Sequence, residues 1–288
     1  MSALGRLLRW GGIILSVAAL NGLQACQDRA AGSGQVQTVS PAVQLGERQS
    51  GYAGSPDDWV AFLSCWHEAA RDRHEEKARQ QPDKPYAPIV RQDPRTTDQL
   101  QSRESMIAAI ERLEVSLGVS LPKSYKDFLL AYRPPPYKPQ IVGAVAFNIG
   151  IYAPSQVGRY GKLEPQLVAE EEKWWIHSSD ADYFTYGIPQ DDVSGRTSYH
   201  RDAIVVGKYG DSRYEVIVLY PQVRTADREM EAALFYHSGE FRAPSFAELM
   251  RQLSILEIKD IDHMPPYPQS ILRGTCADKL SMVNVWWE

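Results

Sequence analysis

The sequence has few of the residue patterns that mark an enzyme or a metalloprotein. It contains six histidines and three cysteines, and no two histidines have the i and i+4 spacing of a zinc-binding helix. It also lacks a Gly-x-Ser-x-Gly nucleophile motif, a phosphate-binding loop and a dinucleotide-binding fingerprint. His67 and His74 are seven residues apart, and we expect both to lie partly exposed on a charged helix. We therefore expect no metal, no cofactor and no catalytic residues.

Basic residues are fewer than acidic ones. The chain has 31 lysines and arginines against 36 aspartates and glutamates, a net charge of −5 at pH 7. Proteins that bind nucleic acid need clustered basic side chains to neutralise phosphates. The acidic balance thus argues against a nucleic-acid partner and favours a basic protein partner.

Long apolar runs are missing as well. The apolar stretch from Trp10 to Leu20 is shorter than the roughly 20 residues that a membrane-spanning helix needs. Arg6 and Arg9 precede it and a small residue, Ala25, follows, which is the pattern of an export signal. An ordinary cleaved signal and an uncleaved anchor are the alternatives to the interpretation given next.

The residues Leu23-Gln24-Ala25-Cys26 resemble the lipobox of bacterial lipoproteins. The resemblance implies that residues 1–25 are removed as a signal peptide and that Cys26 is acylated. Two or more acyl chains are enough for stable anchoring. We therefore expect a periplasmic protein held by lipid to the inner or the outer membrane.

Two cysteines, Cys65 and Cys276, remain after this assignment. In an oxidising compartment they form a possible disulfide. Buried free thiols are the equal alternative.

The order of the remaining segments predicts an α+β fold. Residues 26–54 are rich in Gly, Ser and Gln and are expected to form a flexible tether. Ser55-Pro56-Asp57-Asp58 has the residues of a helix start. Apolar spacing predicts a second helix over about 97–117, and Leu121-Pro122 opens a third. β-branched and aromatic runs then predict strands, before Pro244-Ser245 starts a closing helix; the runs are 141–152, 203–207, 215–220 and 232–237, with the second and third expected to pair antiparallel.

Four short motifs are similar to those of the SUKH superfamily, the Smi/Knr-like proteins. They are Ile110-Glu111-Arg112-Leu113-Glu114, then the stretch from Leu121-Pro122 to Phe128-Leu129, then Ile151 to Val157, and finally Ser245 to Leu249. The resemblance implies a SUKH-like fold: N-terminal helices, an antiparallel-rich sheet and a closing helix. Many bacterial members are immunity proteins that neutralise toxins, and the resemblance implies no catalytic residues.

This resemblance covers about residues 103–256 and sets the expected domains. Residues 55–102 form an N-terminal helical extension, 103–260 the SUKH-like domain with an insertion at 159–201, and 261–288 a C-terminal tail packed on that domain. Six side chains are expected in the core: Leu113, Tyr125, Phe128, Leu129, Phe246 and Leu249.

The insertion is the candidate partner-binding region because it mixes acidic with aromatic residues. Acids steer basic partners, and Trp and Tyr are frequent interface anchors. An amphipathic helix with Val168, Trp174 and Trp175 packed inward is the alternative interpretation. The candidate residues, including three from the turn between the predicted strands, are Glu170, Glu171, Glu172, Trp174, Trp175, Asp180, Asp182, Tyr183, Tyr209, Asp211 and Tyr214.

The sequence therefore leads to the hypothesis of a membrane-anchored immunity protein. It would bind a secreted or interbacterial toxin, for example a type VI effector, and block it by stoichiometric occlusion. The alternative is an envelope-associated adaptor lipoprotein that binds a cell-wall or secretion component.

Overall fold

The structure is a computed structural model that describes residues 45–84, 101–134, 140–141, 149–174, 177–210, 214–236, 239–259 and 264–287. The predicted signal peptide, Cys26 and residues 26–44 of the predicted tether lie outside these residues. Trp175 and Asp211 also lie outside them, and the side chain of Trp174 is not described. The prediction of a flexible tether is wrong for residues 45–54, because Leu45 and Tyr52 are buried and the Ser50 hydroxyl donates to the Asp227 carboxylate at 2.5 Å.

Helix α2 (Pro56–Gln80) begins where the sequence predicts. The Ser55 hydroxyl accepts a hydrogen bond from the Asp58 amide at 3.3 Å, and the Asp58 carboxylate accepts one from the Ser55 amide at 2.8 Å. This reciprocal cap satisfies donors that a helix start otherwise leaves free. The face that carries Trp59, Phe62 and Trp66 is fully buried.

The two helices predicted next are also present. Helix α3 (Arg103–Leu117) ends at Gly118, whose φ of 66° is a left-handed conformation that glycine adopts without strain. Helix α4 (Lys123–Tyr132) follows Leu121-Pro122. The closing helix is α9 (Phe246–Lys259).

Between α4 and α9 the strands form one sheet in which every pairing is antiparallel. The strand order is β1-β2-β4-β5-β6-β7, with β3 pairing β4. The predicted pairing of 203–207 with 215–220 is confirmed, since Ile204 lies opposite Leu219. Helices and an antiparallel sheet confirm the α+β class. The strands are β1 (Gln140–Ile141), β2 (Gly150–Ile151), β3 (Gly158–Arg159), β4 (Ile204–Lys208), β5 (Val216–Arg224), β6 (Met230–Tyr236) and β7 (Gly239–Ala243).

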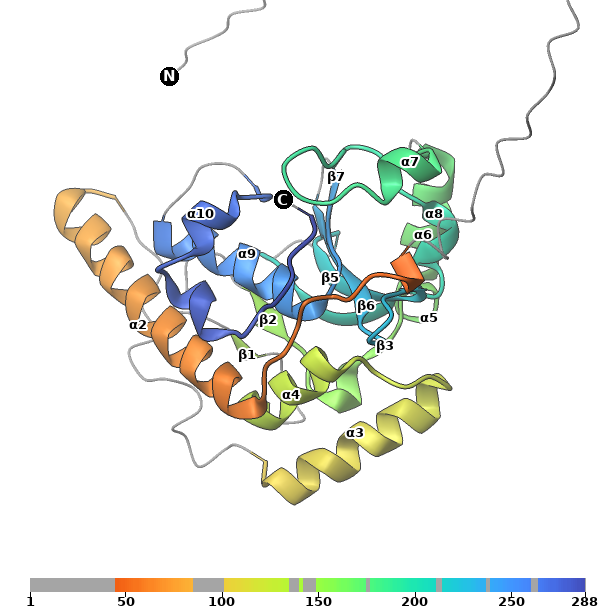
Figure 1. Cartoon of the computed structure of the whole chain (residues 1–288), viewed down its shortest axis with the longest axis horizontal. Helices are drawn as coiled ribbons and strands as arrows, with labels where there is room; N and C mark the ends of the chain where they lie inside the picture. The colour runs from red at the N-terminus through yellow and green to blue at the C-terminus, as the bar shows by residue number, and fades with distance from the viewer. Residues whose placement is uncertain are drawn as a thin grey trace, which may run out of the picture. The chain divides into compact units, whose positions relative to one another are not determined.

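Helices lie on both faces of the sheet (Figure 1), and each face packs in its own apolar cluster. Alternate strand residues point to opposite faces, so Leu219 packs with α2, α4 and α9 while Val218 packs with the insertion. The six predicted core residues all lie in the first cluster, and none is more than 4% exposed. That prediction is confirmed.

The C-terminal segment packs against α2 and α9 through α10 (Gln269–Leu272) and the 3₁₀ helix η3 (Cys276–Lys279). Cys65 of α2 and Cys276 of η3 form a disulfide, with their Cα atoms 5.4 Å apart. The segment then runs beside residues 51–53, where the Val283 amide donates to the Gly51 carbonyl at 2.7 Å. The open question of whether the two cysteines pair is thus answered in favour of the disulfide.

Candidate functional site

The predicted insertion folds as short helices on one face of the sheet. Apolar side chains of three of them, such as Tyr160, Val168 and Tyr183, form a cluster with Val205, Val218 and other residues of β4 to β6. Together the helices cover the face opposite α2, α4 and α9 (Figure 1). The helices are α5 (Tyr160–Leu163), α6 (Pro165–Trp174), α7 (Asp180–Tyr183) and α8 (Thr197–His200).

The three consecutive glutamates of α6 do not form a uniform acidic surface. Glu170 and Glu172 are exposed, and Glu172 pairs with the guanidinium of Arg201 at 2.8 Å. Glu171 is half-buried: one carboxylate oxygen accepts a hydrogen bond from the Tyr160 hydroxyl at 3.0 Å, and the other lies 2.9 Å from His200 Nδ1. Glu171 therefore fixes α6 to the protein, and its prediction as a partner contact is corrected.

The two aspartates of α7 are exposed, as expected for a contact surface. Asp182 accepts a hydrogen bond from the Ser179 hydroxyl at 2.6 Å at the start of the helix. Asp180 forms an ion pair with Arg196, whose guanidinium also lies 4.9 Å from the Tyr183 ring centre. Part of the predicted acidic charge is therefore offset by nearby arginines, since Asp180 pairs with Arg196 and Glu172 pairs with Arg201.

The prediction that Tyr183 binds a partner is wrong. Its side chain is fully buried, and its hydroxyl donates to the Glu231 carboxylate of β6 at 2.5 Å. The Tyr186 hydroxyl donates to the other oxygen of the same carboxylate. Both tyrosines hold the insertion to the sheet from inside, because a buried carboxylate requires donors.

The turn between β4 and β5 brings the last candidates to the surface. Tyr214 is exposed and Tyr209 is half-buried, and the Tyr209 amide donates to the Glu215 carbonyl at 2.9 Å. Of these two candidates, Tyr214 presents more surface, and Tyr209 packs against the first apolar cluster.

A network of buried charges lies beneath the insertion. The Glu240 carboxylate of β7 accepts a hydrogen bond from the Tyr220 hydroxyl at 3.1 Å, and it lies 3.4 Å from both His200 Nε2 and Arg242 Nη1. Arg242 also donates to the carbonyls of Asp191 and Ser194, each at 3.1 Å. Such groups are costly to bury unless they are paired, so the network ties α6, α8 and the 187–195 loop to β7.

The network shifts the pKa values of the ionisable side chains within it. Burial opposes a charge on His200, but its hydrogen bonds with Glu171 and Glu240 outweigh that effect and raise its pKa to about 9. Burial likewise opposes the charge on Glu240, yet His200 and Arg242 hold its pKa below the usual value. Burial raises the pKa of Glu231 to about 7, despite the nearby Arg242. With a pKa of about 9, His200 is expected to carry a proton at neutral pH, and its ring lies between the side chains of Glu171 and Glu240.

The loop of the insertion also covers the outer edge of the sheet. The side-chain amide of Gln190 donates to the Arg242 carbonyl at 2.7 Å, and its oxygen accepts from the Arg242 amide at 2.6 Å. The Asp192 carbonyl accepts from the Glu240 amide at 2.7 Å. An uncovered edge strand is open to pairing with other chains, so this loop protects β7.

The described part of the chain contains no candidate metal site. No group of three His, Cys, Asp or Glu side chains there is placed to hold a metal ion. His67 and His74 are buried rather than partly exposed, which corrects that expectation. Within the described ranges, no helix is both long and apolar enough to cross a membrane.

Comparison with known proteins returns no match. No family model, no curated protein and no solved structure is similar to this chain at a significant level.

Proposed function

We propose that this chain is an exported, lipid-anchored protein of SUKH-like fold that binds and neutralises a protein toxin in the periplasm. It acts as a stoichiometric binder that occludes the toxin, without turnover. The lipid on Cys26 raises its local concentration at the membrane that the toxin reaches.

The placement of the SUKH-like motifs supports this fold. Leu113 of the first motif, Tyr125 and Phe128 of the second, and Phe246 of the last lie in one buried cluster. Motifs far apart in the sequence thus contribute to a common core, as related motifs of a single domain should.

The disulfide between Cys65 and Cys276 supports export. Disulfides persist in the periplasm and are rare in the reducing cytoplasm. The bond therefore agrees with the predicted export signal and with the lipobox-like residues Leu23 to Cys26.

The observation that supports binding rather than catalysis is which charged side chains of the insertion and of β7 are exposed and which are buried. Glu170, Glu172 and Asp182 face solvent, with Glu172 beside Arg201, while His200 and Arg242 are fully buried and each lies 3.4 Å from the buried Glu240 carboxylate. A substrate has no access to the buried charges in this arrangement, whereas a basic protein surface meets the exposed acids directly. Exposed carboxylates above a buried hydrogen-bonded network are suited to recognising a basic partner.

The test is protection of a cell from a toxin whose gene lies beside this one. Cells that lack this chain should be killed by that toxin delivered to the periplasm, and the wild-type chain should restore growth. The Cys26→Ser variant should be released from membranes and protect less well. Growth without this chain in the presence of active toxin would reject the proposal. Cross-linking of the chain to a cell-wall or secretion component would then favour an envelope adaptor.

A further inference from the structure

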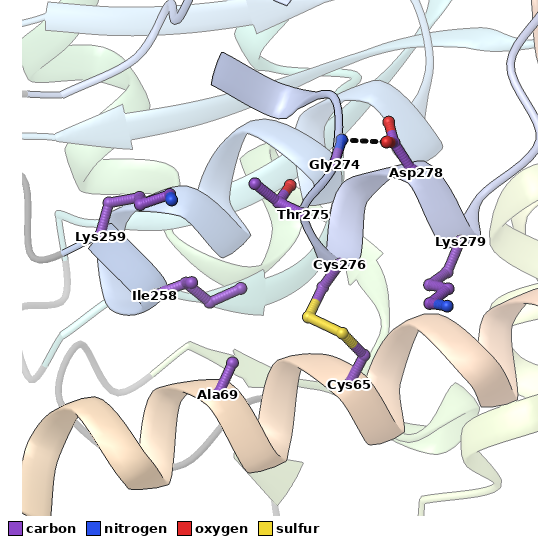
Figure 2. Close-up of a pocket in the computed structure, with 9 residues that line it drawn as sticks. All are labelled: Cys65, Ala69, Ile258, Lys259, Gly274, Thr275, Cys276, Asp278 and Lys279. Carbon is purple, nitrogen blue, oxygen red and sulfur yellow. Dashed lines mark hydrogen bonds between the residues drawn. A yellow bond between two sulfur atoms is a disulfide. The ribbon is translucent and has the colours of Figure 1, made fainter. Parts of the chain in front are cut away.

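A pocket of about 500 Å³ opens beside the disulfide, between α2, the end of α9 and the segment that contains η3 (Figure 2). Ala69 and Ile258 supply apolar walls, and both Cys65 and Cys276 line the pocket. The disulfide therefore borders a space large enough for a small molecule.

The pocket is locally cationic on a protein that is acidic overall. Among the described residues, its charged side chains are Lys259, Lys279 and Asp278. The Asp278 carboxylate accepts a hydrogen bond from the Gly274 amide, which is drawn as a dashed line in Figure 2. Residues three apart eclipse one another in a 3₁₀ helix, so Lys279 lies on the same side of η3 as Cys276.

We propose that this pocket is a thiol–disulfide exchange site that receives a small anionic thiol. In the first step the thiolate of the reagent attacks the Cys65 sulfur, a mixed disulfide forms on Cys65, and Cys276 leaves as a thiolate. In the second step another thiolate attacks the sulfur of the reagent in that mixed disulfide and releases Cys65 as a thiolate. The two reagent molecules are oxidised to their own disulfide, and the two electrons reduce the protein disulfide to two cysteines.

The geometry favours attack on Cys65. Its side chain is half-buried, whereas Cys276 is only 4% exposed. Cationic side chains stabilise thiolates, and Lys279 lies on the same side of η3 as Cys276, which leaves as the thiolate. The two lysines also attract the negative charge of the incoming thiol.

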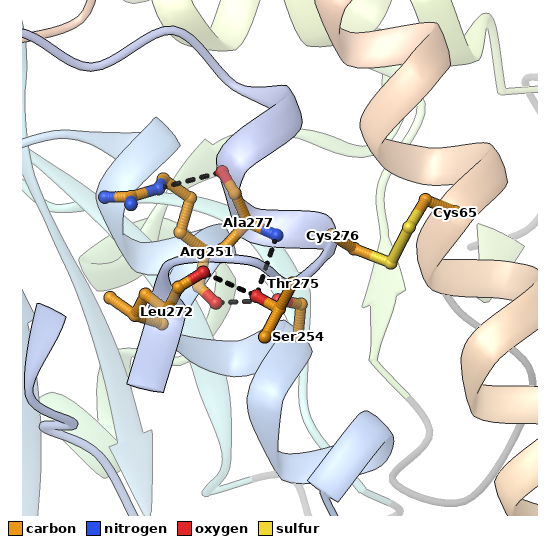
Figure 3. The surroundings of a disulfide bond; sticks show 7 residues. All are labelled: Cys65, Arg251, Ser254, Leu272, Thr275, Cys276 and Ala277. Atoms are coloured by element: carbon orange, nitrogen blue, oxygen red, sulfur yellow. Dashed lines mark hydrogen bonds between the residues drawn. A yellow bond between two sulfur atoms is a disulfide. The ribbon is translucent and has the colours of Figure 1, made fainter. Parts of the chain in front are cut away.

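Exchange takes place in the folded protein because other bonds hold the C-terminal segment in place. Arg251 Nε donates to the Ala277 carbonyl at 3.1 Å (Figure 3), and the Tyr267 amide donates to the side-chain oxygen of Gln252 on α9 at 2.8 Å. Further along, Ala53 and Ser281 share a backbone hydrogen bond of 2.9 Å. Opening the disulfide therefore removes a covalent link between α2 and η3 without removing the docked segment.

The experiment compares reduction by glutathione, which is anionic, with reduction by cysteamine, which carries a positive amine. The full chain carries Cys26→Ser, so that Cys65 and Cys276 are its only cysteines. Both rates are measured on the folded protein and divided by the rates on the same protein unfolded in urea, which removes differences in intrinsic thiol reactivity. We expect the folded protein to favour glutathione by about fivefold, as attraction by two nearby lysines at low ionic strength should give.

The matched variants separate the pocket from the overall charge. Lys259→Glu with Lys279→Glu should reverse the preference, so that cysteamine reacts faster. Lys162→Glu with Lys173→Glu makes the same change in net charge on the insertion and should leave the preference intact. Circular dichroism confirms that each variant is folded. The same preference in wild type and pocket variant would overturn the proposal, as would reduction no faster than global unfolding.

Mass spectrometry of the trapped intermediate tests the direction of attack. We expect the glutathione adduct on Cys65, and an adduct confined to Cys276 would overturn the assignment of the attacked sulfur. None of these measurements requires a toxin, so they succeed or fail independently of the proposed function.

Discussion

At the scale of single residues, Phe128 on α4 packs against two other helices. Its ring centre lies 5.2 Å from that of Trp59 on α2 and 5.3 Å from that of Phe246 on α9. Phe128→Ala should lower the free energy of unfolding by about 3–5 kcal/mol, since it removes a fully buried aromatic ring and leaves a cavity. Urea denaturation measures the loss. Val115→Ala, at a position 83% exposed, is the control and should change stability by less than about 0.5 kcal/mol.

Glu171 and Glu170 offer a second comparison, between neighbours with different roles. Glu171→Gln keeps the shape of the side chain but removes the charge that His200 faces, so it should cost about 1.5–3 kcal/mol. The pKa of His200 should also fall, which a proton NMR titration of its ring measures. Glu170→Gln, on the exposed side of α6, should change neither quantity. Equal effects of the two substitutions would contradict the role assigned to Glu171.

The same residues show where sequence patterns stop being informative. The apolar spacing of Leu113, Phe128 and Leu249 predicted burial correctly, because helical periodicity depends only on local order. Tyr183 and Glu171 were predicted at the surface because they belong to an acidic, aromatic segment. Their burial depends on Glu231 and His200, which lie far away or on another helix. No local pattern contains that information.

At the scale of elements, the disulfide joins α2 and η3 through two cysteines that are 211 residues apart in the sequence. Replacing both cysteines by alanine should lower the free energy of unfolding by up to roughly 5 kcal/mol, the chain-entropy value for a loop of this length. Denaturation of the double variant measures the loss under non-reducing conditions. The reduced wild-type chain is the matched control and should lose nearly the same amount. A double variant as stable as the oxidised wild type would show that the link does not restrain the unfolded chain.

Strand β7 illustrates which elements were missed and why. Its sequence, Gly-Glu-Phe-Arg-Ala, alternates apolar with charged residues and gave no apolar run of the kind that predicted β4, β5 and β6. Glu240 and Arg242 nevertheless point into the protein, because the insertion covers that face of the sheet. The order of the major helices and the central strands was predictable from local patterns. The short helices of the insertion and the edge cover by Gln190 were not, since tertiary contacts define them.

At the scale of the whole molecule, buried ionisable groups set the dependence of stability on pH. His200 has a folded pKa of about 9, above its unfolded value, so its contribution is complete below about pH 6.5 and is lost as the pH rises through 9. Glu231 and Glu229 each have a pKa that burial raises to about 7, so the folded state binds protons that the unfolded state has released. Stability therefore falls between about pH 4.5 and 7 on their account as well.

The free energy of unfolding should consequently be greatest near pH 5 and lower at pH 9 by at least about 3 kcal/mol, since one pKa unit corresponds to about 1.4 kcal/mol. Urea denaturation across this range measures the profile. Glu231→Gln cannot ionise and should make the decline below pH 7 shallower, leaving the share that Glu229 contributes there and the decline toward pH 9. A wild-type stability that increases from pH 5 to pH 8 would contradict the assignment.

The exposed charge of the insertion determines how fast the chain meets a basic toxin. Glu170→Lys with Glu172→Lys removes the exposed ion pair between Glu172 and Arg201 but leaves Glu171 and the buried network in place, so the insertion should remain folded. We expect association with the toxin encoded beside this chain to slow about tenfold at low salt and to lose most of its salt dependence. Glu104→Lys with Glu111→Lys changes the net charge equally on exposed positions of α3 and should slow association far less. Stopped-flow kinetics at several ionic strengths distinguish the two surfaces. Equal slowing would mean that only the net charge matters, and no slowing in either variant would move the search for the interface to the turn that carries Tyr209 and Tyr214.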